Sequence, residues 1–321
     1  MTDIRAVTSM RRRIDLLDPH RDPEPPWWEA LRRLAGLRAT WAWEVLAVAG
    51  PLGIAVVHEG DAIVALAAAR WSLGVANVAA PGSTGQPGWW VADPARQTEL
   101  FGVLARGLRA RFRHAVLGTL WRELDRDQAD GLGGIRITRE VNPTAVLPIE
   151  WPDEAGWLST LSSNRRRSLR AEARWLSRDQ DLIAGSGPVS ALDADQLIGL
   201  FRRTEEKYDG LGRAPRMPDE WLYRLLSRPE VLTMHYHDAD RNLLAAFTIL
   251  DHPTWPLVHR WGALPVEEGG RKHLYFDAFR RTVGWAVSEG KHGLIWGKGL
   301  PDVKERLGCR LVPRYAVAVA W

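Results

Sequence analysis

The two halves of this 321-residue chain carry the same order of predicted elements, and this repetition constrains the fold more than any other feature. In the first half, hydrophobic periodicity predicts strands at 53–58, 63–69 and 75–79, a helix at 94–112, a strand at 115–120, a helix at 121–129 and a strand at 135–149. In the second half, it predicts strands at 231–237, 243–250 and 257–264, a helix at 271–289, a strand at 294–296, a helix at 301–307 and a strand at 311–321. This order is typical of tandem α/β domains that arose by duplication, although two mixed α/β halves can also share it by chance.

A segment punctuated by prolines at 142–153 separates the two halves. We therefore expect an N-terminal extension at 1–40, a first domain at 41–150, and a helical linker followed by a second domain at 151–321. The linker begins with helical periodicity over 153–161 and 164–178. Each domain is expected to close its own sheet with the last strand of its half.

The composition is that of a soluble globular protein, with 45% hydrophobic and 26% charged residues. The net charge of +4 permits a polyanionic partner but does not require one. A single cysteine, Cys309, excludes an internal disulfide and fits a reducing compartment. The first residues lack the apolar core of a secretory signal, and the most apolar window, 45–57, is too short for a membrane span. We expect a cytoplasmic protein.

A Gly-Gly-Arg-Lys turn opens the long helix predicted at 271–289. A glycine turn at a helix N-terminus offers free backbone N–H groups to an anion, and the helix dipole favours negative charge there. Gly269, Gly270, Arg271 and Lys272 are therefore candidates for holding the phosphates of a donor substrate. The alternative is a plain turn that starts the helix.

Four arginines fall four residues apart on the helix predicted at 164–178 and form one row along its surface: the donor-binding candidates Arg166, Arg170 and Arg174, and Arg178. The run of arginines at 165–167 also opposes the positive end of the helix dipole. This unfavourable placement is reasonable where an anion docks, which makes the row a second candidate for donor binding. The alternative is an ordinary basic face in contact with solvent.

The strand predicted at 257–264 alternates so that His259 and Trp261 share one face and Val258 and Arg260 share the other. His259 is a candidate general base for an acceptor amine, or a core histidine with satisfied hydrogen bonds.

Several other chemistries are excluded. His235 and His237 share a strand face, but no third ligand stands at metal spacing, so no metal site is predicted. The sequence also lacks a Walker loop, a Gly-x-Ser-x-Gly motif and a paired His/Cys nucleophile.

Together, these features resemble the GNAT acyltransferase superfamily. The chain resembles the tandem-domain Fem-type aminoacyltransferases and related acetyltransferase-like proteins. The resemblance rests on the basic helix at 162–176, on the helical linker, and on a C-terminal domain preceded by a degenerate copy of the same domain. The resemblance covers about 40–321 in layout, and it is most specific in the basic helix and in 297–308. It implies an α/β fold of tandem GNAT-like domains, each a mixed central sheet flanked by helices, with a helical linker. The first domain is expected to be degenerate, because its loop at 81–88 has no basic residue.

The resemblance also implies residue roles. In GNAT folds the strand at 294–296 splays from the strand before it and opens a slot for the acyl group. Lys304 corresponds to a lysine of Fem-type proteins, where a cation can neutralise the oxyanion of the tetrahedral intermediate or hold the 3′ end of a tRNA. Lys298 in the same loop is a second candidate. Acceptor binding is assigned to Glu205, Tyr208 and Trp261.

The donor turn departs from the family pattern. The GNAT turn that binds coenzyme A has the form Arg/Gln-x-x-Gly-x-Gly/Ala, whereas two carboxylates precede Gly269 here and His273 stands where a small residue is expected. This departure weakens acyl-CoA as the donor and favours aminoacyl-tRNA. If tRNA is the donor, the arginine row with Arg271 and Lys272 should line one basic track into the slot beside Lys304.

We therefore expect an N-acyltransferase that transfers an aminoacyl group from aminoacyl-tRNA to a small-molecule amine acceptor in a biosynthetic pathway, without a cofactor or a metal. One alternative is a GNAT N-acyltransferase with acetyl-CoA or another acyl-CoA as donor. Another is a non-catalytic RNA- or ligand-binding protein on a GNAT scaffold. We expect a monomer, because the tandem repeat acts as an internal dimer.

Overall fold

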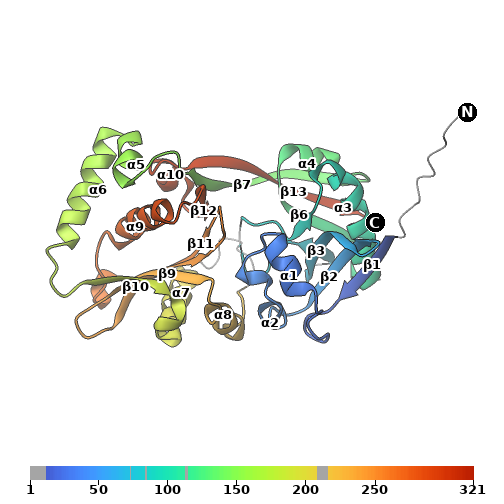
Figure 1. The fold of residues 1–321 in the computed structure, drawn as a ribbon, viewed down its shortest axis with the longest axis horizontal. Helices are drawn as coiled ribbons and strands as arrows, with labels where there is room; N and C mark the ends of the chain where they lie inside the picture. Colours follow the sequence, from blue (N-terminus) through green and yellow to red (C-terminus); the bar gives the residue numbers. More distant parts are fainter. Residues whose placement is uncertain (1–11, 73, 84, 113–114, 208–215) are drawn as a thin grey trace, which may run out of the picture.

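The computed structural model describes residues 12–72, 74–83, 85–112, 115–207 and 216–321, and it shows two lobes bridged by two long strands (Figure 1). The first lobe contains β1 (Arg12–Leu17), α1 (Trp28–Leu34), α2 (Trp43–Leu46), β2 (Leu52–Glu59), β3 (Ala62–Ser72), β4 (Val75–Val78), β5 (Trp89–Val91), α3 (Gln97–Phe112), β6 (Gly118–Leu124) and α4 (Arg126–Gly131). The second lobe contains α5 (Glu154–Thr160), α6 (Ser163–Leu176), β8 (Ile183–Pro188), α7 (Ala194–Lys207), α8 (Asp219–Leu226), β9 (Val231–His237), β10 (Leu243–Leu250), β11 (Leu257–Ala263), α9 (Leu274–Ser288), β12 (Gly293–Gly297) and α10 (Pro301–Glu305). The bridging strands are β7 (Arg136–Pro148) and β13 (Arg310–Ala320).

The strands form one mixed sheet in the order β1-β2-β3-β4-β6-β13-β7-β12-β11-β10-β9-β8, with β5 pairing with β3 to the side. Most neighbours are antiparallel. The parallel pairs among the described strands are β4 with β6 and β11 with β12, and a long helix, α3 or α9, crosses over between the members of each pair. The two lobes thus repeat one layout, as predicted from the sequence.

The closing strands of the two lobes are exchanged. The strand β13 pairs with β7 from Arg310↔Val146 to Val319↔Arg136, and its other edge pairs with β6 of the first lobe. The end of β7, in turn, pairs with β12. The expectation that 311–321 closes the second sheet is therefore wrong. The periodicity of a strand shows which of its faces is buried but not which strand pairs with it. Between the lobes, β7 and β13 pair with each other and so satisfy the hydrogen bonds of their backbone groups. A domain boundary near residue 150 stays a prediction.

The neighbouring strands β11 and β12 separate almost as soon as they meet. They pair only at Leu257↔Ile295, although β11 continues to Ala263 and β12 to Gly297. In the first lobe, β4 and β6 stay paired from Val75↔Gly118 to Val78↔Trp121. The slot expected between the two strands is therefore present in the second lobe.

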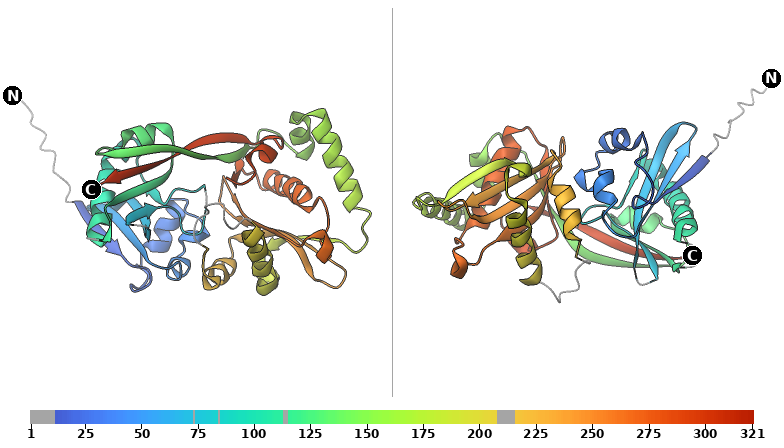
Figure 2. Two further views of the ribbon diagram at one scale, coloured as in Figure 1. Left: turned by 180° about the vertical axis from the view of Figure 1, so that it is seen from behind. Right: turned by 90° about the horizontal axis from the view of Figure 1, so that it is seen from below.

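Helices cover both faces of the second-lobe sheet. On one face, Phe279 of α9 and Trp157 of α5 belong to one buried cluster. On the other face, Phe201 of α7 and Trp221 of α8 belong to a second cluster, which also contains Val45 of α2. The helices α2 and α8 face each other across the lobes (Figures 1 and 2). The second cluster therefore contains residues of both lobes.

Part of the expected N-terminal extension is built into the first lobe. The strand β1 pairs with β2 from Arg12↔Glu59 to Leu17↔Ile54. Trp28 of α1 is 1% exposed, and its ring centroid lies 5.1 Å from that of Trp43. Among the helices of the described ranges, none has the length and apolar character needed to cross a membrane.

Candidate active site

A cavity of about 230 Å³ lies where β11 and β12 separate. Four residues predicted from the sequence line it: His259, Trp261, Lys298 and Lys304. The remaining lining residues are Thr204, Phe247, Leu257, Val258, Arg260, Tyr275, Trp296, Gly297, Gly299 and Leu300. The slot and both candidate lysines are thus at one place, which we call the slot cavity.

Lys304 places an amine inside the second lobe, where the residue is only 6% exposed. Its Nζ donates a hydrogen bond to the backbone carbonyl of Trp296, and no carboxylate of the described residues neutralises it. Burial lowers the pKa of Lys304 to about 8, because a charged amine is poorly solvated there. At neutral pH the amine still carries its proton. A desolvated ammonium group of this kind is suited to an oxyanion that forms in the slot.

A β-bulge at His259 changes the faces of β11. The pairing of β11 with β10 skips His259, so two residues of β11 oppose one step of β10. His259 and Arg260 consequently both lie beside Trp221 of α8, at 6.1 Å between ring centroids and 5.9 Å from guanidinium carbon to ring centroid. Val258 and Trp261 instead belong to the cluster that packs on α9. The predicted sharing of one face by His259 and Trp261 is wrong, because regular alternation does not survive a bulge.

His259 is held by the first lobe. Its Nε2 lies 2.9 Å from the carbonyl oxygen of Gly82, so this nitrogen carries the proton, and the buried Nδ1 has no partner among the described residues. Burial lowers the pKa of His259 to about 3, which makes the ring a weak base. This position fits the alternative of a core histidine better than that of a general base.

The residues predicted to bind the acceptor differ in how far other side chains already engage them. Glu205 forms ion pairs with Arg202 at 2.6 Å and with Arg260. Burial acts to raise the pKa of Glu205, but the two arginines outweigh it and hold this pKa below the usual range. Trp261 lines the slot cavity, and its ring centroid lies 4.5 Å from that of Phe247. Tyr208 lies outside the described residues.

The turn at 266–270 is closed by its own backbone. The N–H of Gly269 donates to the carbonyl of Val266 at 3.1 Å, and that of Gly270 to the carbonyl of Pro265 at 2.9 Å. A Cβ at Gly270 would lie 2.0 Å from the Leu264 carbonyl oxygen, so the glycine is required by this close approach. These two amides are not offered to a phosphate. The geometry is that of the plain turn, the alternative raised from the sequence.

The two cations that follow this turn, Arg271 and Lys272, lie in different surroundings. Arg271 forms an ion pair with Asp179 at 2.7 Å, and it also donates to the carbonyl of Gly269. Lys272 is exposed. Asp179, in the segment after α6, therefore neutralises Arg271, which was predicted to hold a phosphate.

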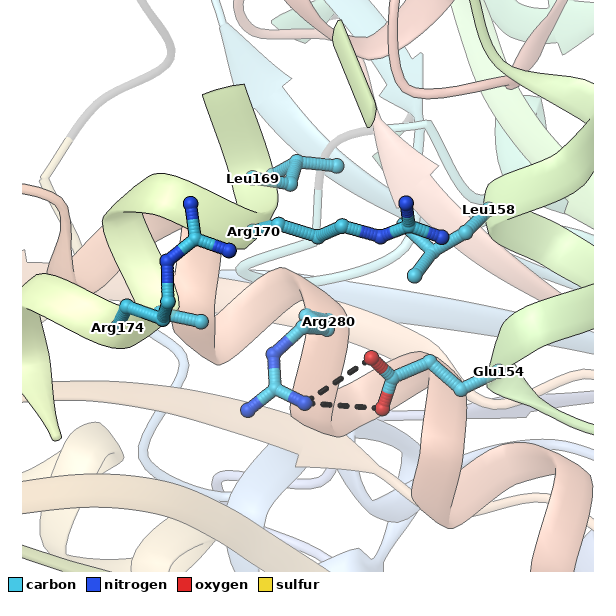
Figure 3. Close-up of a pocket in the computed structure, with 7 residues that line it drawn as sticks. Glu154, Leu158, Leu169, Arg170, Arg174 and Arg280 are labelled. Atoms are coloured by element: carbon cyan, nitrogen blue, oxygen red, sulfur yellow. Dashed lines mark hydrogen bonds and ion pairs between the residues drawn. The ribbon is translucent and has the colours of Figure 1, made fainter. Parts of the chain in front are cut away.

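Part of the arginine row lies on a second hollow, of about 240 Å³, between α5, α6 and α9 (Figure 3). Arg170 and Arg174 line it together with Arg280, which forms an ion pair with Glu154 at 3.0 Å. Arg166 instead donates to the carbonyls of Ser159 and Leu161, at 3.0 and 2.5 Å, at the C-terminal end of α5. We call the hollow the arginine groove.

The arginine groove and the slot cavity share no lining residue. Arg271 and Lys272 line neither of the two, so one basic track from the arginine row to Lys304 stays a prediction. Sequence spacing shows which residues share a helix face, but it does not show which surface that face meets.

Sequence reasoning missed the contribution of the first lobe. Its glycine-rich loop reaches the second lobe, where Gly82 accepts the hydrogen bond from His259 and a Cβ at Gly85 would lie 3.5 Å from the Gly297 Cα atom. Glu123 of β6 forms an ion pair with Lys298 at 2.6 Å. The glycines of the loop were visible in the sequence, but no local signal marks Glu123.

The described residues hold no group of three or more side chains suited to a metal ion. The rings of His235 and His237 pack against each other at 5.0 Å between centroids. Burial lowers the pKa of His235 to about 4, which keeps that ring neutral.

Three solved structures share this arrangement. L-PGS from Bacillus licheniformis is similar with a TM-score of 0.64 and 13% sequence identity, over 93% of this chain and 92% of that one. FemX is similar with a TM-score of 0.56 and 10% identity, over 88% and 91%. A tandem GNAT protein from the clavulanic acid biosynthesis pathway is similar with a TM-score of 0.52 and 12% identity, over 96% and 98%. The chain has the tandem GNAT fold.

The tandem GNAT fold predicted from the sequence is therefore confirmed. No protein-family model and no curated protein sequence matches the chain. At these low identities the likeness establishes the fold, and the chemistry has to be argued from the residues of this chain.

Proposed function

We propose that the protein is an N-acyltransferase that transfers an aminoacyl group from aminoacyl-tRNA to an amine acceptor in the slot cavity. The observation that carries this proposal is Lys304, a desolvated cation without a carboxylate partner among the described residues, beside the strands that separate. Acyl transfer needs such a charge where the carbonyl oxygen becomes negative. The GNAT fold of L-PGS and FemX agrees with this chemistry.

The proposed reaction forms one amide bond and breaks one ester bond. The uncharged acceptor amine attacks the ester carbonyl of the aminoacyl-tRNA, and the resulting oxyanion lies by the Lys304 ammonium group. Collapse of the tetrahedral intermediate expels the ribose oxygen at the tRNA 3′ end, which leaves as a hydroxyl with the proton lost by the amine. No redox partner is needed.

The closed turn at 266–270 favours tRNA over coenzyme A as the donor. The helix α9 begins only at Leu274, and the two glycine N–H groups predicted to hold a phosphate, those of Gly269 and Gly270, are engaged within the turn before it. The exposed Arg170 and Arg174 supply positive charge for a nucleic-acid backbone on the arginine groove.

An acyl-CoA donor is the second candidate, because the tandem GNAT protein from the clavulanic acid biosynthesis pathway, whose structure is one without AcCoA, has the same fold. A melting-temperature comparison separates the two donors. We expect total charged tRNA to stabilise the protein and coenzyme A to leave it unchanged. Stabilisation by coenzyme A alone would transfer the proposal to the second candidate. Binding of uncharged and charged tRNA without any turnover would indicate a non-catalytic RNA-binding protein.

Replacing Arg170 or Arg174 with Ala is expected to weaken the binding of every tRNA alike, because phosphate contacts carry no sequence information. Each lost contact should reduce the slope of log Kd against log salt concentration by about one. Filter binding at several salt concentrations measures this. Arg126→Ala, on α4 of the first lobe and 66% exposed, is the matched control and should leave the slope unchanged. An unchanged slope in the groove variants would make the row a solvated helix face.

Turnover of the wild-type protein is expected to fall as the pH rises through about 8, the pKa of Lys304. The ammonium form exists below this pKa, and above it the neutral amine no longer stabilises an oxyanion. Lys304→Met should remove this alkaline limb together with most of the rate. Deacylation of charged tRNA by hydroxylamine, which stays uncharged from about pH 7 to 10, measures the profile. A rate that climbs through pH 8 would assign Lys304 the role of a base.

A further inference from the structure

Glu123 reaches from the first lobe to Lys298, a residue that lines the slot cavity, although Glu123 itself does not line it. Its Oε1 pairs with the Nζ of Lys298 at 2.6 Å, and Lys298 lines the cavity. The side chain of Glu123 is 9% exposed, so it is more than nine-tenths buried. Its second oxygen, Oε2, is buried and has no hydrogen-bond partner among the described residues. A buried carboxylate oxygen without a donor is unfavourable unless a ligand supplies one.

The backbone at Glu123 is built to hold this position. Glu123 has a φ of 63°, in the left-handed region that residues other than glycine seldom occupy. The pairing of β6 with β13 passes from Leu124↔Tyr315 to Trp121↔Val317, so two residues of β6 oppose one of β13. Such a bulge re-aims a side chain, and strained conformations of this kind concentrate at functional sites.

Two other partly buried carboxylates, Glu205 and Glu172, differ from Glu123 in their partners or their place. Glu205 is engaged by Arg202 and Arg260. Glu172 also has a partnerless oxygen, but it belongs to α6, where it pairs with Arg165. Within the described part of the chain, Glu123 is therefore the carboxylate that pairs with a slot-lining lysine and keeps a buried oxygen without a donor.

We propose that Glu123 Oε2 binds the primary ammonium group of a substrate, while Lys298 holds Oε1 and fixes the carboxylate plane. An ammonium N–H donor satisfies both the charge and the hydrogen-bonding deficit of a buried carboxylate oxygen. Glu123 would then select substrates that carry a primary amine. This assignment deepens the proposed function and rests on it for the identity of the substrate, though not for the existence of the ammonium site.

Two substrates of an aminoacyl transfer carry such a group: the donor, through its free α-ammonium group, and the acceptor, through its amine before it loses a proton. The chemistry of recognition is the same for both. If the donor is bound here, acetylation of its α-amine should weaken binding. If the acceptor is bound here, acetylation should have no effect on donor binding, and a small ammonium ion should bind equally well with and without charged tRNA.

The test compares the wild-type protein with Glu123→Gln, which keeps the shape of the side chain and removes its charge. The first measurement is the binding of n-butylammonium against that of n-butanol, followed by melting temperature. The second is the binding of total aminoacyl-tRNA against the same tRNA after N-acetylation. We expect the wild type to prefer the ammonium form about 10–100-fold in at least one measurement, and Glu123→Gln to lose that preference.

Two further variants separate binding from scaffolding. Lys298→Met should keep the preference for the ammonium form, because Glu123 remains charged, and Glu150→Gln, an exposed carboxylate paired with Arg310, should behave as wild type. The proposal is overturned if the wild type shows no preference in either measurement, or if Lys298→Met loses the preference as fully as Glu123→Gln does. If charged tRNA does not bind while n-butylammonium is still preferred, the tRNA donor is wrong and the ammonium site stands.

Discussion

Replacing Lys304 with Ala should lower turnover by about 10²–10³-fold while leaving the affinity for charged tRNA nearly unchanged. The reason is the timing of the charge. The ester carbonyl of the bound donor is neutral, and its oxygen becomes negative only as the tetrahedral intermediate forms, so the ammonium group acts mainly in the transition state. Single-turnover rates and equilibrium binding of the same charged tRNA measure the two effects separately.

Lys291→Ala provides the matched control for this variant. Lys291 is a similarly shielded lysine, with 9% of its side chain exposed, but its Nζ pairs with Asp251 at 2.9 Å. Its loss should therefore reduce stability and leave turnover per folded molecule intact. Equal turnover in wild type and Lys304→Ala would remove the oxyanion role from Lys304. A loss of tRNA affinity as large as the loss of rate would instead assign Lys304 to the binding of the tRNA 3′ end.

Replacing Trp157 with Ala should destabilise the second lobe by about 3–5 kcal/mol. Trp157 is fully buried, its ring stacks with that of Phe279 at 5.7 Å between centroids, and its Nε1 donates to the carbonyl of Leu307 at 3.0 Å. The variant removes a large packed side chain and leaves that carbonyl, just after α10, without its donor. Urea denaturation followed by a signal from the second lobe measures the loss.

Trp175→Ala is the control for this stability prediction, because Trp175 on α6 is 46% exposed. A surface substitution of this kind should change the free energy of unfolding by less than about 0.5 kcal/mol. If Trp157→Ala were as stable as Trp175→Ala, the buried α5–α9 contact would not hold the lobe together. Trp157→Phe should keep most of the packing and remove only the hydrogen bond from Trp157 to the Leu307 carbonyl. Since Leu307 follows the helix that carries Lys304, the turnover of this variant shows whether that hydrogen bond affects catalysis.

The sequence predicted what depends on local pattern. Repeated periodicity gave the order of the elements that the two lobes share, though not β1, β5 or β8, and the lysines at 298 and 304 were expected in the slot where the structure places them. Features that depend on tertiary pairing were not predictable. The exchange of β7 and β13 does not alter the alternation of apolar and polar residues along either strand, so the sequence does not reveal it. The bulge at His259 changes the face on which that residue lies, but the residues next to it in the sequence give no sign of the bulge.

The contribution of the first lobe to the site was hidden for a similar reason. Glu123 lies 175 residues before Lys298 in the chain, and it falls in the helix predicted at 121–129, whereas the structure places it in β6. The closed turn at 266–270 was open to both interpretations, because Gly269 and Gly270 serve a phosphate cradle and a plain turn equally well. Only the hydrogen bonds of their own amides distinguish the two.

A single-turnover assay tests the central claim most directly. The protein, in excess, is mixed with labelled total aminoacyl-tRNA or with labelled acetyl-CoA, and hydroxylamine is supplied as a surrogate amine acceptor. The account predicts formation of aminoacyl hydroxamates from charged tRNA well above the rate without protein, a loss of about 10²–10³-fold with Lys304→Ala, and no transfer from acetyl-CoA. Transfer from acetyl-CoA, with charged tRNA reacting only at the rate seen without protein, would contradict it.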